Sequence, residues 1–112
     1  MNDITPPVKR VSKEEMRRLF NEGSYYQRAL DGEFQMVTLE SRHPCLSQAH
    51  QPFCTCSQII SFRDSNDDEV ARAHQYLLPD KTLGGFGAPD PKRMYIRGVI
   101  YKLLGEKGTL TK

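Results

Sequence analysis

The chain has 112 residues, of which 38% are hydrophobic and 27% are charged, and its formal net charge is +2 at pH 7. This length and balance indicate a single globular domain spanning residues 1–112, because a chain of this size builds one core. No segment approaches the roughly 20 consecutive apolar residues of a membrane span, and the first ten residues lack the apolar stretch of a signal peptide. We therefore expect a cytosolic (cytoplasmic) protein.

The N-terminal third predicts an extended segment followed by helices. The first ten residues contain two adjacent prolines and are expected to form a mobile arm. Ser12 and Glu15 have the spacing of a capping box, which predicts a helix from Ser12 to Glu22 that Gly23 terminates. Residues 25–30, YYQRAL, predict a second short helix, and their two adjacent tyrosines leave a strand open as the alternative.

After Gly32 the apolar residues follow the two-residue alternation of strands. The turn cluster DSNDD predicts an antiparallel hairpin, and the dipeptide Arg97-Gly98 predicts a tight two-residue hairpin. The fold class is therefore α+β, with one or two N-terminal helices packed on an antiparallel meander of about five strands and a frayed tail at residues 105–112. The strands are expected in FQMVTLES (34–41), FCTCSQIISFR (53–63), EVARAHQYLL (69–78), MYI (94–96) and VIYKLL (99–104).

The segment EVARAHQYLL carries the candidate catalytic residues. Alternation puts Val70, Arg72, His74 and Tyr76 on one face and two alanines on the other, where small side chains suit close packing by a helix. Cleaving RNA without a metal needs a proton acceptor, a proton donor and a cation at the phosphate. Arg72, His74 and Tyr76 have this chemistry, although a single exposed histidine is more often an ordinary surface residue.

The glycine-rich segment LGGFGAPDPKR, residues 83–93, is a candidate phosphate-binding loop. It does not fit a dinucleotide fingerprint, because Asp90 stands at the third glycine and the prolines on either side prevent a helix. Two interpretations remain: a rigid crossing between strands, or a bend where Lys92 and Arg93 meet a phosphate. The candidate anion-binding residues are Lys92, Arg93 and Arg97, in a C-terminal region rich in Lys and Arg.

A third cluster has the residue types of a zinc site. Zinc takes four nitrogen or sulfur ligands, and one loop with the strand that it enters gathers His43, Cys45, His50, Cys54 and Cys56. The cysteines are spaced Cys-x-Cys and form no Cys-x-x-Cys pair, which favours chance clustering over a metal centre. We therefore expect no bound metal and no cofactor.

The run HQYLLPDKTLGGFGAPDPKRM, followed by a strand, a two-residue turn and GVIYKL, resembles a stretch of small uncharacterised bacterial and phage-type proteins. The resemblance covers residues 74–103, departs from that pattern at Lys81 and Phe86, and implies no activity. The layout of helix followed by meander also resembles that of the barnase- and RelE-type ribonuclease toxins. That resemblance implies a metal-independent ribonuclease, but it rests on layout and on no shared motif.

The sequence thus predicts a basic surface formed by Arg72, His74, Lys92, Arg93 and Arg97 that binds an anionic partner. The expected partner is the backbone of RNA or DNA, with ribonuclease activity as the catalytic form of this hypothesis. The alternative is a protein-interaction module, an inhibitor or adaptor, that uses the final hairpin, because tyrosine and arginine are favoured where proteins bind each other. The sequence does not separate these two classes.

Overall fold

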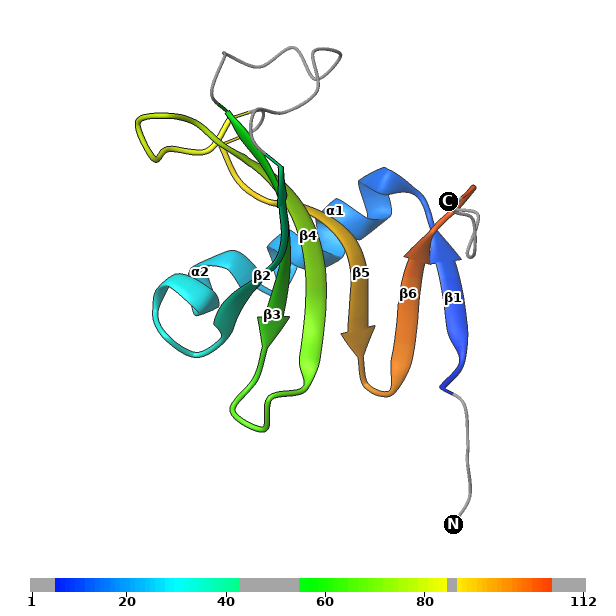
Figure 1. Ribbon diagram of the computed structural model, residues 1–112. Coiled ribbons are helices and arrows are strands. Elements are labelled where there is room, and N and C mark those ends of the chain that lie inside the picture. Colours follow the sequence, from blue (N-terminus) through cyan, green and yellow to red (C-terminus); the bar gives the residue numbers. More distant parts are fainter. Residues whose placement is uncertain (1–5, 43–54, 85–86, 106–112) are drawn as a thin grey trace.

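The computed structural model describes residues 6–42, 55–84 and 87–105. Two helices and six strands occur in this part of the chain (Figure 1). In chain order they are β1 (Val8–Val11), α1 (Lys13–Glu22), α2 (Tyr25–Leu30), β2 (Gln35–Arg42), β3 (Cys56–Arg63), β4 (Glu69–Leu77), β5 (Asp90–Ile96) and β6 (Val99–Leu103).

All six strands form one mixed sheet in the order β1-β6-β5-β4-β3-β2. Strands β2 to β6 are consecutive and antiparallel, whereas β1 pairs in parallel with β6 at the edge. The α+β class is confirmed, and the sheet has one strand more than the meander that the sequence predicts. Helix α1 crosses behind β4 and β5 in Figure 1 and packs mainly against β5 and β6.

Residues 8–10 belong to strand β1 and not to an N-terminal arm. Val8 lies opposite Ile100 and Val11 opposite Leu103. The amide of Ile100 also donates a hydrogen bond to the Pro7 carbonyl (2.9 Å). The segment has the extended conformation expected after two prolines, but its partner strand lies about 90 residues further along the chain, where no local pattern reveals it.

Helix α1 begins as the sequence predicts. Ser12 is the N-cap, and its hydroxyl accepts a hydrogen bond from the Glu15 amide (3.1 Å). The Glu15 carboxylate accepts a bond from Arg18 Nε (2.8 Å), one turn further along the helix. Gly23 ends the helix with φ −80°, so it is not required by a left-handed conformation. A Cβ at Gly23 would lie 2.4 Å from Cε1 of Tyr25, and this close approach explains the glycine.

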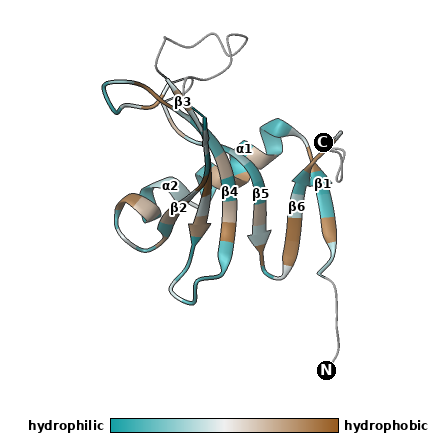
Figure 2. Ribbon diagram, viewed as in Figure 1, coloured by the Kyte–Doolittle hydropathy of each residue, from teal (hydrophilic) through white to brown (hydrophobic). Residues whose placement is uncertain are grey.

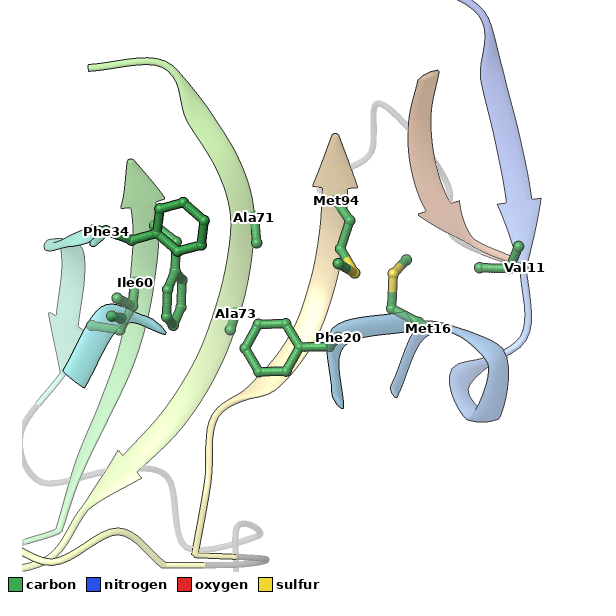
Figure 3. Packing of buried hydrophobic residues seen from close by; sticks show 10 residues of the cluster. Val11, Met16, Phe20, Phe34, Ile60, Ala71, Ala73 and Met94 are labelled. Atoms are coloured by element: carbon green, nitrogen blue, oxygen red, sulfur yellow. The ribbon is translucent and has the colours of Figure 1, made fainter. Parts of the chain in front are cut away.

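The core lies between the helices and one face of the sheet (Figure 3). Met16 and Phe20 of α1 share this cluster with Ala71 and Ala73 of β4 and with Met94 of β5. All of them are at most 2% exposed. Because the side chains of the two alanines are small, the aromatic ring of Phe20 can approach the backbone of β4. Arg72, the residue between them on β4, therefore points to the opposite face.

Both predicted hairpins are confirmed. The turn between β5 and β6 consists of Arg97 (φ 50°) and Gly98 (φ 80°), the pair of positive φ angles that a two-residue type I′ turn requires. An arginine in this conformation costs roughly 1 kcal/mol. The antiparallel pair β3–β4 is joined by residues 64–68, in which Asp64 accepts hydrogen bonds from the amides of Asn66 and Asp68.

Candidate functional site: the open face of the sheet

The face of the sheet opposite α1, here called the open face, carries a row of cations. Arg72 of β4 lies opposite Arg93 of β5, Arg93 lies opposite Lys102 of β6, and Lys102 lies opposite Arg10 of β1. Their chain neighbours Ala71, Ala73 and Met94 point into the core, so alternation turns these cations outward. We call these four residues the cation row; neighbouring strands in it are about 4.8 Å apart.

Only part of this charge is neutralised. Arg72 donates to both carboxylate oxygens of Glu69 (3.0 and 3.1 Å), and Glu69 also accepts a bond from the buried hydroxyl of Ser61 (2.6 Å). Arg93 and Lys102 form no ion pair within residues 6–42, 55–84 and 87–105. Like charges directly opposite each other destabilise a sheet, so the centre of the row is an unfavourable arrangement in the free protein.

A β-bulge adds Lys92 to the open face. The register between β4 and β5 shifts after Arg72, so that Lys92 and Arg93 together oppose this one residue. Pro91, which has no amide hydrogen to offer, sits beside the bulge and is buried opposite Ala73. Bulges re-aim side chains in this way, and here two consecutive cations share one face.

A second bulge corrects one sequence expectation about β4. The register between β3 and β4 shifts between Phe62 and Arg63, which leaves Val70 without an opposite residue. Val70 packs against the core and does not lie with Arg72 on the open face. Glu69 takes that position, and for this reason its carboxylate can reach the guanidinium of Arg72.

A pocket of about 180 Å³ lies at the end of β4 beyond the cation row. Its lining includes His74, Tyr76, Asp90 and Lys92. The His74 ring is hydrogen-bonded through Nε2 to the Ser57 hydroxyl (2.8 Å) and meets the Tyr76 ring edge to face, with centroids 4.6 Å apart. The pocket therefore holds a histidine, a tyrosine, a carboxylate and an ammonium group together.

An ion-pair chain fixes the charged groups of this pocket. Asp90 Oδ1 accepts from Arg17 Nε of α1 (2.9 Å), and Asp90 Oδ2 accepts from Lys92 Nζ (3.3 Å). Burial raises the pKa of Asp90, but the bond from Arg17 and the charge of Lys92 outweigh burial and lower this pKa overall. Asp90 therefore remains a carboxylate and holds Lys92 beside the pocket.

His74 is held in its neutral form. Burial lowers its pKa first, the positive charge of Lys92 lowers it further, and Asp90 opposes the shift. A neutral imidazole has one nitrogen that accepts a proton and one that donates. His74 is thus able to act as a proton acceptor at neutral pH, which is the role that a general base requires.

The structure brings together part of the residue set that the sequence predicts. Arg72, His74 and Tyr76 share the open face of β4, but Arg72 is engaged by Glu69. Lys92 and Arg93 are adjacent, whereas Arg97 lies in the hairpin turn, four residues beyond Arg93, or about 13 Å along the strand at roughly 3.3 Å per residue. Lys92 and Arg93 thus lie together, and Arg97 lies apart from them in the turn between β5 and β6.

Sequence reasoning missed Lys102, Arg10 and Ser57. Each lies on a strand that alternation alone assigns to no particular neighbour, and only the register of β1, β6 and β3 brings them to the open face. The alternation in VIYKL was a signal that could have found Lys102. It predicts that Tyr101 and Lys102 point to opposite faces of the sheet, and since Tyr101 packs against the core, Lys102 lies on the open face.

Two amides of the glycine-rich segment donate hydrogen bonds within the protein. The amide of Gly84 donates to the Tyr76 carbonyl (2.8 Å), and that of Gly87 donates to Gly84 (3.1 Å). A phosphate cradle needs amides that point at the ligand, so these bonds favour the interpretation as a rigid crossing. Gly85 and Phe86 lie outside the described residues.

The candidate zinc ligands lie mostly outside the described part of the chain. This holds for His43, Cys45, His50 and Cys54, whereas Cys56 is the first residue of β3. Within the described residues there is no group of three or more His, Cys, Asp or Glu side chains suited to a metal ion. The expectation that the protein binds no zinc therefore stays a prediction.

Comparisons with known proteins add no relative to this description. No protein-family model, curated protein or solved structure matches the chain. Among the helices that the structure describes, none has the length and apolar composition needed to cross a membrane.

Proposed function

We propose that the open face binds the sugar–phosphate backbone of a nucleic acid. The observation that carries this proposal is the cation row, and above all Arg93 opposite Lys102 at its centre. Residues that break a rule of sheet stability are expected at functional sites, where a ligand compensates for the cost. Anionic oxygens lying along the row would relieve the repulsion between these two side chains.

The length and the charge of the cation row fit a nucleic-acid backbone. Four cations from four adjacent strands form a line about 14 Å long at a strand spacing of roughly 4.8 Å, which is long enough for more than one phosphate group. Lys92, whose ammonium group Asp90 also contacts, lies next to this line at the β4–β5 bulge. Because helices cover only the other face of the sheet, no described helix obstructs this line.

The test is the salt dependence of binding. If the row contacts phosphates, the logarithm of affinity should fall with the logarithm of salt concentration, by about 0.7 per contact on single strands and about 0.9 on duplex DNA. Replacing Arg93 and Lys102 by alanine should reduce this slope by roughly two contacts. The matched control is Lys13→Ala with Arg18→Ala, which removes the same charge from the exposed side of α1.

Failure would be clear in this experiment. If the wild-type protein binds no RNA or DNA at low ionic strength, or if the α1 control lowers affinity as much as the row variant, the proposal is wrong. The protein-interaction alternative would then be favoured. In that case we expect the open face to bind an acidic protein and no nucleic acid.

A second candidate, cleavage of the bound RNA, is favoured by one specific contact. The Ser57–His74 hydrogen bond orients the imidazole in a pocket that also contains Tyr76 and Lys92. In the proposed reaction His74 removes the proton of a 2′-hydroxyl, whose oxygen attacks the adjacent phosphorus. Tyr76 then gives its proton to the leaving 5′-oxygen, and Lys92 stabilises the charged phosphorane.

This candidate has its own test. His74→Ala should reduce RNA cleavage by roughly 10²- to 10⁴-fold, as the loss of a general base does, while affinity for the uncleaved strand stays the same. A 2′-deoxy strand should bind and remain intact, because it lacks the attacking oxygen. Cleavage that survives in His74→Ala would exclude the mechanism.

A further inference from the structure

A second row crosses the open face beside the cation row. Tyr95 of β5 lies opposite Ile100 of β6, and Val8 of β1 lies opposite Ile100. These three residues follow the same alternation as the cations, and none of them belongs to the core cluster or to the side chains packed against it. Val8 is 47% exposed. We call this set the apolar row.

The two rows lie parallel to each other. Tyr95 is two residues from Arg93, Ile100 two from Lys102, and Val8 two from Arg10, which is about 7 Å along each strand. Figure 2 shows that β6 and β1 are hydrophobic near the β5–β6 turn and that each has a hydrophilic stretch before its last residue, which is again hydrophobic. Any polymer bound along the cations therefore has an aromatic and aliphatic strip at its side.

We infer that the open face is specific for single-stranded nucleic acid, with its phosphates on the cation row and an unstacked base on Tyr95. This inference rests on the proposed function and deepens it by naming the class of strand. A duplex hides its base faces, whereas a single strand offers both charges and flat apolar rings. The side-by-side arrangement of Arg93 with Tyr95, and of Lys102 with Ile100, matches those two parts of a nucleotide.

The chemistry of stacking sets the expected effects. A base stacked on an aromatic side chain contributes an amount that alanine substitution lowers by about 1–3 kcal/mol, which corresponds to a roughly 5- to 150-fold loss of affinity. Tyr95→Leu should therefore weaken binding to a single-stranded oligonucleotide by at least about fivefold, while Tyr95→Phe should retain it. The affinity for inorganic polyphosphate, which has charges and no bases, should be unchanged in both variants.

A fluorescent reporter tests the contact directly. The chain contains no tryptophan, so Tyr95→Trp would supply its only one. Stacking of a base should quench this fluorescence on addition of oligo(dT), whereas polyphosphate should not. The control is Tyr26→Trp on α2, which packs on the helical side of the core and should not respond. Thermal unfolding of each variant checks that it is folded.

The outcomes separate this inference from the proposed function. Equal affinity for oligo(dT), for a duplex of the same length and for polyphosphate, with no quenching in the Tyr95→Trp variant, would overturn single-strand specificity while the cation row keeps its role. Binding of poly-glutamate as tightly as of oligo(dT) would point to an acidic protein partner and would overturn it as well. If none of these polyanions binds, both proposals are wrong.

Discussion

Arg93 and Lys102 lie directly opposite each other on β5 and β6, and no carboxylate of the described residues pairs with either. Repulsion between opposite like charges lowers the stability of the free sheet. A ligand that brings negative charge to this position relieves the repulsion, and the free energy that the repulsion costs the fold then favours binding. A substitution that removes the repulsion should therefore raise the free energy of unfolding and lower the affinity for the ligand.

Lys102→Glu should therefore stabilise the free protein and weaken its binding of nucleic acid. Turning the like-charge pair into an ion pair with Arg93 should raise the free energy of unfolding by about 0.2–1 kcal/mol. Urea denaturation measures the first effect, and a binding titration measures the second. Lys102→Gln, which removes the repulsion without adding attraction, should be intermediate in stability. Unchanged affinity in Lys102→Glu would contradict the role of the row.

His74 should make the protein less stable in mild acid. Its pKa is lowered in the folded state from the ordinary value of 6.5, so the unfolded chain binds the proton more readily. The contribution to stability is complete above pH 6.5 and is lost as the pH falls from there to the folded pKa. In His74→Gln this slope should be absent. The measurement is the free energy of unfolding between pH 5 and 8 (roughly the range in which histidine titrates).

Asp90→Asn tests the ion pair between α1 and the sheet. Because the pKa of Asp90 is lowered, the carboxylate contributes stability above its ordinary value near 3.8, and this is lost as the pH falls below it. We expect the variant to be about 1 kcal/mol less stable than wild type at neutral pH and nearly equal to it in strong acid. Asp67→Asn is the control, since the Asp67 side chain is 75% exposed and should show little difference.

Gly23→Ala should destabilise the fold although its backbone is ordinary. The new methyl group would meet the ring of Tyr25, which stacks between Phe20 and Phe34 with centroid distances of 5.7 and 5.6 Å. Overpacking of this kind costs about 1–3 kcal/mol. The change should be much smaller in a Tyr25→Leu background, which double-mutant analysis of thermal or urea unfolding can establish. Equal costs in both backgrounds would show that the contact is not the cause.

Local signals in the sequence were sufficient for the helix that Ser12 caps and for the turn at Arg97-Gly98, because caps and two-residue turns depend on residues a few positions apart. They were insufficient for β1, whose pairing partner is distant, and for the cation row, which depends on register. His74 and Tyr76 were placed correctly by alternation along β4. Val70 was not, since a bulge changes the alternation and leaves no signature in a single sequence.

The parallel pairing of β1 with β6 also has a consequence for how the chain folds. Val8 meets Ile100 only after nearly the whole chain has been arranged, so this contact closes the longest loop in the sheet. The entropy of closing such a loop is lost before the contact is gained, and pairings of this kind slow folding. The local hairpins β3–β4 and β5–β6 are therefore expected to form first. The edge that completes both rows would dock last, and the Arg10 and Val8 ends of the rows would be assembled at that step.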